Sequence, residues 1–427
     1  MNSSMEQEPK SLSRSAAVSL AFFGVGLLTF VLSLVLLVIH PEVLSGDPRR
    51  AEVLALTHML TLGWMSSLIF GTIYTLVPLT AAARLRSVPL ACVHLFFHVQ
   101  GLILMVLGFF ETPFAEVSHG GTFMSVGLLL FFLNLYLTAA KFNRWEPANI
   151  TIIMSLFWLL ASGVTGVLLF LNQHLEFADD PEGMIALHAH FGLVGFAWLM
   201  LIGSGLKIFS MFLVGGSQPG LLSWVGSCLI NLALFLWIPA GLLPEFPLRA
   251  AINWMLLAGA LAYLIEKTRL CASARDRMGW GLATALLGYV LGILILVWIQ
   301  IGSPNPLGES LTGPEWVRAY FVVAVLGPAS FILFGLASRL VPFLYAQMRL
   351  LANPGKPAGK AVFDSTRSAA ELPIFVCLVL GIGYVTVAQL LDQTPGVQLG
   401  AVCLLVASGW LAYLALPWGK EEAKAEN

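Results

Sequence analysis

The chain has 427 residues, of which 58% are hydrophobic and 11% are charged, and its formal net charge at pH 7 is −1. About a quarter of the residues of an ordinary soluble protein are charged, so this composition excludes a soluble protein and indicates one whose solvent is the lipid bilayer. It also excludes nucleic acid as a partner, because binding it would need a strongly basic face.

Twelve apolar stretches of about 20 residues follow one another, each long enough to cross a hydrocarbon core of roughly 30 Å. They lie near residues 16–39, 52–79, 88–110, 119–140, 148–171, 185–209, 221–243, 248–266, 279–301, 316–340, 371–391 and 396–416. No cleavable signal precedes the first stretch, so we expect a retained helix there. The sequence therefore predicts an all-α membrane protein with twelve transmembrane helices.

Basic residues are concentrated in alternate loops. The two termini and the loops after the second, fourth, sixth, eighth and tenth predicted helices hold 18 of the 22 lysines and arginines. Lysine and arginine are enriched in cytoplasmic loops, so this bias predicts that both termini lie in the cytoplasm. The regular alternation also supports the count of twelve helices.

The sequence repeats itself at a constant interval. Three pairs of glycines, equally spaced within each pair, mark the repeat: Gly63 with Gly71, Gly195 with Gly203, and Gly327 with Gly335. The separation of Gly63 from Gly195 equals that of Gly195 from Gly327, and we call it the repeat interval. Such a repeat in a membrane protein indicates a pseudo-symmetric bundle, and an even number of spans per copy places its axis along the membrane normal. The expected role of the glycines is close helix packing.

The domain organisation follows from this repeat and from the spans. We predict three four-helix repeats within the membrane domain 16–416, at residues 16–140, 148–266 and 279–416. The third repeat is expected to contain a cytoplasmic linker at 341–370. Residues 1–15 and 417–427 are the expected cytoplasmic tails.

No histidine follows His190, and two of the eight histidines occupy equivalent places in the repeat. His58 and His190 each stand five positions before the first glycine of a pair, where the third copy has Val322. Ionisable groups at membrane depth are costly and usually functional, so both are candidate haem ligands. His188 and His190 point about 200° apart on a helix and are expected to serve two different sites. The hypothesis is a b-type haem between the first two repeats, with His58 and His190 as axial ligands and His188 facing a second site.

A second pair, His94 and His98, is spaced one helical turn apart and shares one face of the third predicted helix. This spacing allows one helix to hold one metal ion, so the pair is a candidate haem or copper site. The alternative is a buried pair that hydrogen-bonds to neighbouring carbonyl groups. Weaker candidates lie at the outer side: Glu111 for proton transfer, Arg49, Arg50 and Arg318 for haem propionates, and His40, His119 and His174 for a site role.

Two motifs resemble the catalytic subunit, subunit I, of the haem-copper oxidases and nitric oxide reductases. The second predicted helix carries a histidine followed by a G…Y-x-L-V-P end, formed by His58, Gly71, Tyr74, Leu76, Val77 and Pro78. The segment LHAHFGLVG, with His188 and His190, is similar to the family's HxH motif, in which each histidine serves one of two haems. The resemblance implies a twelve-helix fold in three quasi-repeats and a bound haem. Membrane proteins of the NnrS type, with haem, copper and a role in the nitric oxide response, are also similar.

The chain departs from the oxidase pattern at the oxygen-reducing centre. The family's HxH lies on the tenth helix, where this chain has Tyr320 and Val322, and the seventh predicted helix lacks the histidine pair that would hold copper. The resemblance therefore implies a degenerate member without a complete binuclear centre, acting in electron transfer or in a nitric oxide or oxygen response. It also implies a cell inner membrane and a redox partner or second membrane subunit; if the protein is an enzyme, it is a haem-dependent oxidoreductase.

Two further hypotheses stay open. One is a polytopic transporter or copper-handling permease, in which His94, His98 and the outer histidines line a path and no haem binds. The other is an assembly protein that kept the fold and lost its cofactor, which would agree with the histidine-free third repeat.

Overall fold

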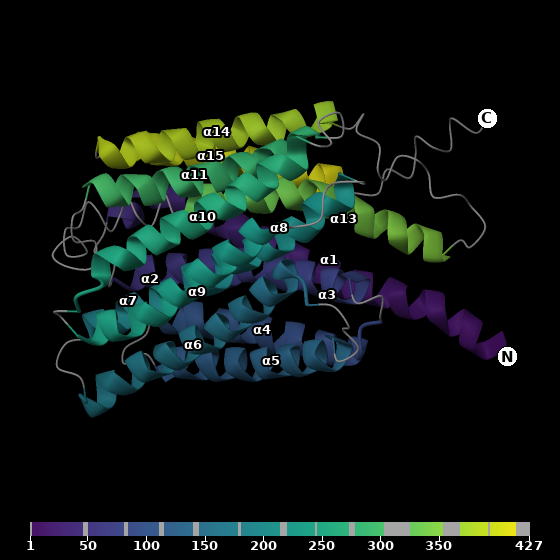
Figure 1. Ribbon diagram of the computed structural model, residues 1–427, viewed down its shortest axis with the longest axis horizontal. Helices are drawn as coiled ribbons and strands as arrows, with labels where there is room; N and C mark the ends of the chain where they lie inside the picture. The colour runs from purple at the N-terminus through teal and green to yellow at the C-terminus, as the bar shows by residue number, and fades with distance from the viewer. Residues whose placement is uncertain are drawn as a thin grey trace.

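The computed structural model describes residues 2–45, 50–80, 84–110, 115–139, 145–177, 181–213, 220–243, 246–272, 278–302, 325–352, 368–391 and 393–415. Within these ranges every regular element is a helix (Figure 1). The helices are α1 (Asn2–Ile39), η1 (Pro41–Ser45), α2 (Ala51–His58), η2 (Met59–Ser66), α3 (Ser67–Thr80), α4 (Val88–Gly108), α5 (Ala115–Ala139), α6 (Pro147–Leu175), α7 (Glu182–His190), η3 (Phe191–Trp198), α8 (Leu199–Phe212), α9 (Leu221–Leu242), α10 (Arg249–Ala272), α11 (Trp280–Gly302), α13 (Pro328–Ala352), α14 (Ser368–Leu390) and α15 (Thr394–Ala415).

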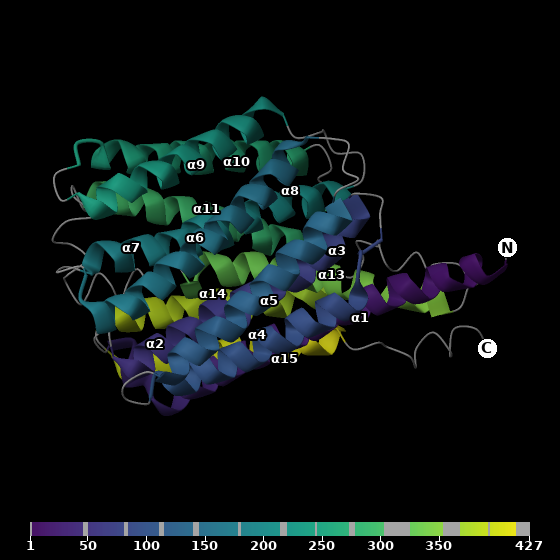
Figure 2. The same cartoon turned by 90° about the horizontal axis from the view of Figure 1, so that it is seen from below.

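The predicted all-α membrane fold is confirmed. The described residues contain twelve helical stretches that are long and apolar enough to cross a membrane, and most of their bounds lie within a few residues of those expected. Figures 1 and 2 show these helices running side by side along the long axis of the molecule. The second and tenth spans, Ala51–Pro78 and Pro328–Tyr345, are the most buried: 67% and 78% of the residues in their 18-residue apolar windows are buried. These helices therefore form much of the interior of the bundle.

The structure describes parts of two segments predicted to lie outside the spans. In the linker expected at 341–370, α13 continues to Ala352 and α14 begins at Ser368. The N-terminal tail expected at 1–15 is helical from Asn2 and continuous with the first span. In both places the helix extends beyond its apolar span, which hydropathy cannot detect. Residues 353–367 of the linker and the tail 417–427 lie outside the described residues.

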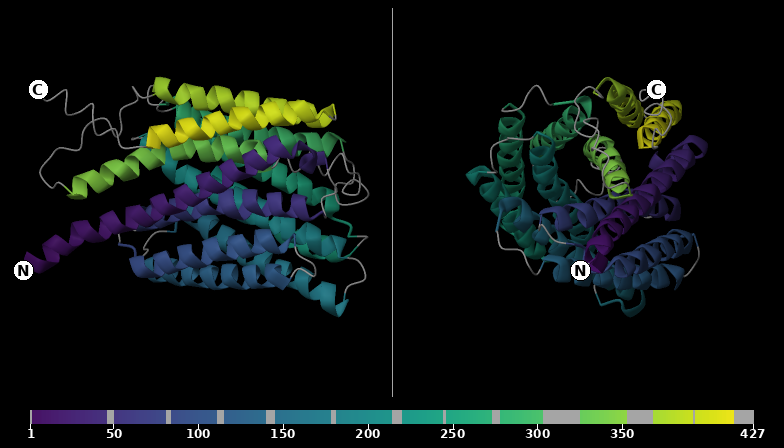
Figure 3. Two further views of the ribbon diagram at one scale, coloured as in Figure 1. Left: turned by 180° about the vertical axis from the view of Figure 1, so that it is seen from behind. Right: turned by 90° about the vertical axis from the view of Figure 1, so that its right-hand side faces the viewer.

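The third and fourth helices of each predicted repeat pair as hairpins, α4 with α5, α9 with α10 and α14 with α15. The end-on view in Figure 3 shows the three hairpins at the periphery of the bundle. Each hairpin crosses where two glycines face each other: Gly101 with Gly120, Gly226 with Gly259, and Gly381 with Gly400. A Cβ at the first glycine of each pair would lie 2.9–3.0 Å from the carbonyl oxygen of the second, so the backbones approach closely only because both residues are glycine.

The repeat glycines have the packing role expected of them. A Cβ at Gly71 would lie 2.8 Å from the Ser19 carbonyl of α1, and one at Gly203 would lie 3.1 Å from the Ala148 carbonyl of α6. A Cβ at Gly335 would lie 2.5 Å from the Gly281 carbonyl of α11. In each predicted repeat the glycine-bearing helix therefore packs closely on the first helix of its own four.

Polar links also recur at the repeat interval. On each glycine-bearing helix, the side chain one helical turn after the second glycine bonds to a neighbouring segment. The links join Thr75 to Ser19, Lys207 to Glu146, and Arg339 to Glu371. The hairpins, the glycine contacts and these links each occur once in every one of the three predicted four-helix segments.

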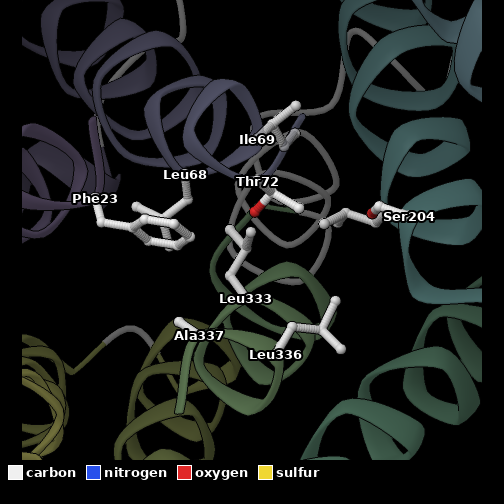
Figure 4. Close-up of a pocket in the computed structure, with 9 residues that line it drawn as sticks. Phe23, Leu68, Ile69, Thr72, Ser204, Leu333, Leu336 and Ala337 are labelled. Carbon is white, nitrogen blue, oxygen red and sulfur yellow. The ribbon is translucent and has the colours of Figure 1, made fainter. Parts of the chain in front are cut away.

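A small pocket lies where the three glycine-bearing helices meet (Figure 4). Most of its lining residues fall into two sets whose members are separated by the repeat interval. The sets are Ile69, Leu201 and Leu333, and Thr72, Ser204 and Leu336. Residues at equivalent positions of the sequence repeat therefore meet at this pocket.

Candidate functional site

Two π-helical segments follow directly after candidate histidines. His58 ends α2 and precedes η2, and His190 ends α7 and precedes η3. Each bound of η3 follows the matching bound of η2 by the repeat interval, so the repeat extends to this uncommon backbone geometry. π-Helical turns inside α-helices are frequent at functional sites, because they displace side chains from the regular helical positions.

The structure brings His58 and His188 together. Their ring centroids are 6.5 Å apart and their ring planes are inclined by 25°, although the two residues come from different predicted repeats. Both side chains are partly buried. Phe109, at the end of α4, packs on His58 with a centroid distance of 4.8 Å. An imidazole pair therefore lies between α2 and α7 in a largely apolar setting.

The hydrogen bonds of the pair define which nitrogen carries the proton. His58 Nδ1 lies 2.8 Å from the Leu54 carbonyl oxygen, and His188 Nδ1 lies 2.9 Å from the Ser162 carbonyl oxygen. A carbonyl only accepts, so Nδ1 is the donor in each neutral ring and Nε2 keeps its lone pair. Metal-ligating histidines almost always use their second nitrogen in this way, which fixes the tautomer and the ring orientation.

His190 faces another helix. Its Nδ1 lies 2.7 Å from the Ala186 carbonyl oxygen, and its ring stacks on Trp237 of α9 with a centroid distance of 3.7 Å. His188 and His190 therefore point to different sides of their helix, as their two-residue spacing indicates. The structure thus places His188 of α7, rather than the expected His190, beside the His58 ring. Haem ligation by His58 and His190 stays a prediction.

His94 and His98 form a buried cluster in the first predicted repeat. Their side chains are 1% and 2% exposed, and their ring centroids are 6.0 Å apart. His94 Nδ1 lies 3.0 Å from the Tyr74 hydroxyl, and His98 Nε2 lies 2.8 Å from the Ser67 hydroxyl. Phe22 packs against both rings. This surrounding matches the alternative of a hydrogen-bonded buried pair: both rings bond to hydroxyl groups, and His98 also has a backbone hydrogen bond to Leu62.

The remaining candidates contribute little to either cluster. His40 is exposed and pairs with Glu42 at 3.0 Å, Arg50 is exposed and pairs with Glu52 at 3.3 Å, and His119 is exposed. Within the described part of the chain, no group of three or more histidine, cysteine, aspartate or glutamate side chains could hold a metal ion. The other candidates lie outside the described residues: Arg49, Glu111, the side chain of His174, Arg318, Tyr320 and Val322.

Two residues of α6 that contact His188 are absent from the sequence-based prediction. Ser162 bonds to His188 through its carbonyl oxygen and its hydroxyl, and Gly166 lies against the His188 ring. The two are one helical turn apart, and small residues at this spacing are typical of close helix contacts in membranes. The spacing in the fifth span could have indicated the contact, but not that a histidine makes it.

No protein-family model matches the chain, and no curated protein matches it. Function is therefore inferred from the side chains themselves.

Proposed function

We propose that this polytopic membrane protein binds a b-type haem through His58 and His188 and that it acts in electron transfer. The observation that carries the proposal is the imidazole pair, with ring centroids 6.5 Å apart and each Nδ1 bonded to a backbone carbonyl. The resemblance to subunit I of the haem-copper oxidases and nitric oxide reductases, in its degenerate form, points the same way.

The spacing of the pair would allow His58 and His188 to hold one iron together. Bonds from a metal to an imidazole nitrogen are about 2.0–2.1 Å long, so two imidazoles that share one ion would have centroids about 6 Å apart. A site for zinc or copper alone would need a third or fourth ligand. The described residues provide no such group of three. Two imidazoles in apolar surroundings therefore suit haem better than a bare metal ion.

The ligand set favours electron transfer over gas binding. When bound, a haem with two strong imidazole ligands supplies reversible one-electron chemistry and leaves no open position on the iron. The protein's own part is to hold both rings with Nε2 unprotonated, in surroundings that contain few charges. A nitric oxide or oxygen response would require the loss of one ligand. The transporter hypothesis gains no support from His94 and His98, since both are buried and hydrogen-bonded.

Absorption spectra of the purified protein in detergent test the proposal. The wild-type protein, oxidised and then reduced with dithionite, should show a Soret band and the sharp α and β bands of low-spin haem. His58→Ala and His188→Ala should each abolish the low-spin spectrum, because each removes one of the two ligands. His40→Ala, at an exposed histidine outside the pair, is the matched control and should leave the spectrum unchanged.

His190→Ala separates the proposed pairing from the one expected from the repeat. It should leave the low-spin bands in place, because His190 stacks on Trp237 rather than facing His58. Loss of these bands in His190→Ala with retention in His188→Ala would overturn the assignment of His188. A preparation that stays colourless after haem supplementation would overturn the haem proposal as a whole.

A further inference from the structure

The two imidazoles of the pair are held in different ways. His58 Nδ1 bonds to the carbonyl of Leu54, one turn earlier in its own helix. His188 Nδ1 bonds to the carbonyl of Ser162, which belongs to α6. The hydrogen bond that orients His58 therefore lies within α2, whereas the one that orients His188 depends on how α6 and α7 pack.

Ser162 connects α6 to His188 at two points. Its carbonyl oxygen is 2.9 Å from His188 Nδ1, and its hydroxyl donates to the His188 carbonyl oxygen at 3.1 Å. The hydroxyl oxygen also lies 3.5 Å from Nδ1. Ser162 is 7% exposed, so few outside groups can compete for its hydrogen bonds. Together they hold the end of α7 and the imidazole in one register against α6.

Gly166 leaves the space that the His188 ring occupies. A Cβ at this position would lie 3.0 Å from Cε1 of His188, 3.3 Å from Nδ1 and 4.0 Å from Nε2. Contacts of 3.0–3.4 Å are tighter than ordinary van der Waals contacts, so a Cβ at 166 would require the ring to move by a few tenths of an ångström. Gly163, on the same helix, would place its Cβ within 4 Å of nothing. The requirement for glycine is therefore specific to the position facing the imidazole.

We propose that Ser162 and Gly166 form a positioning niche that sets the ring plane and the lone-pair direction of His188. The proposal rests on the proposed function, in which His188 is a haem ligand. Both residues act through the imidazole, Ser162 by accepting and donating hydrogen bonds and Gly166 by leaving room. The niche makes His188 the ligand whose orientation depends on helix packing.

Gly166→Ala and Gly163→Ala are the matched test. In the haem-loaded protein, Gly166→Ala should shift the low-spin electron paramagnetic resonance signal, which depends on the orientation of the axial imidazole planes, or convert part of it to high spin. Gly163→Ala should give the wild-type signal. Ser162→Ala, which removes only the hydroxyl and keeps the carbonyl acceptor, should cause a smaller shift than Gly166→Ala and serves if Gly166→Ala does not fold.

A second measurement does not need haem. In protein labelled with ¹⁵N-histidine, the ring signals of His188 are identified by their loss in His188→Ala. Gly166→Ala should shift them while leaving those of the buried His98 in place, and Gly163→Ala should shift neither. Unchanged His188 signals in Gly166→Ala would overturn the niche even if haem binds. A protein without haem whose His188 signals respond to Gly166→Ala would overturn the proposed function and keep the niche.

Discussion

At the scale of single residues, the buried charged side chains of the described residues are paired or hydrogen-bonded. Arg339 Nη2 donates to Glu371 Oε2 at 3.0 Å, and its Nε lies 2.8 Å from Oε1. The Gly281 amide donates to the same carboxylate at 2.7 Å. Lys267 is fully buried and donates to the Ile202 carbonyl oxygen. Bonds of this kind offset the cost of placing a charge away from water.

Glu371→Gln should destabilise the protein by about 3–5 kcal/mol, because it leaves the Arg339 charge buried without its counter-ion. The free energy of unfolding in detergent, measured with increasing denaturant, checks this. The matched control is Glu52→Gln, whose exposed pair with Arg50 should contribute about 0–1 kcal/mol. Equal effects of the two substitutions would contradict the stabilising role of the buried pair.

At the scale of helices, the three hairpins show how small residues determine packing in a bilayer. Apolar side chains gain little from leaving lipid, so close backbone approach at glycine supplies much of the attraction between helices. In α14, Gly381 faces α15, where a Cβ would meet Leu404 side-chain atoms at 2.7 and 2.9 Å. Gly383, further along α14, would place its Cβ within 4 Å of nothing.

Gly381→Ala should therefore lower the free energy of unfolding by about 1–3 kcal/mol, the usual cost of overpacking a tight contact. Gly383→Ala should have no destabilising effect, because alanine favours the helix and meets no neighbour there. Thermal unfolding of both variants in the same detergent checks the difference. Equal midpoints for the two variants would show that the hairpin does not depend on the close approach at Gly381.

The twelve spans could be predicted from hydropathy, because a helix must be apolar over the part that crosses the lipid. The partner of His58 could not, since it depends on the rotation of α7 against α6, which Ser162 and Gly166 determine through space. The π-helical segments add to this difficulty. Their i to i+5 bonding changes the direction of every later side chain, and no pattern of residue types in η2 or η3 indicates it.

At the scale of the whole molecule, α1 begins and α15 ends at the same end of the bundle (Figure 1). This arrangement agrees with an even number of spans. The distribution of lysine and arginine predicts that this end faces the cytoplasm.

Reporter fusions at the two termini check the predicted orientation. Green fluorescent protein should be fluorescent, and alkaline phosphatase inactive, at both the N-terminus and the C-terminus, because the first requires the cytoplasm and the second an oxidising compartment. Phosphatase fused after residue 177, in the loop between α6 and α7, should be active and serves as the control. Reporters that place the termini on opposite sides would contradict the count of twelve spans.

The pocket between the glycine-bearing helices illustrates a difference between one chain with an internal sequence repeat and a ring of three identical subunits. In a ring of three identical chains, every substitution beside the axis appears three times at once. Here one set of positions holds Thr72 and Ser204 opposite Leu336, and the histidine position holds His58 and His190 but Val322. In a single polypeptide each copy of a sequence repeat can change alone, so equivalent positions can carry different side chains, as they do here.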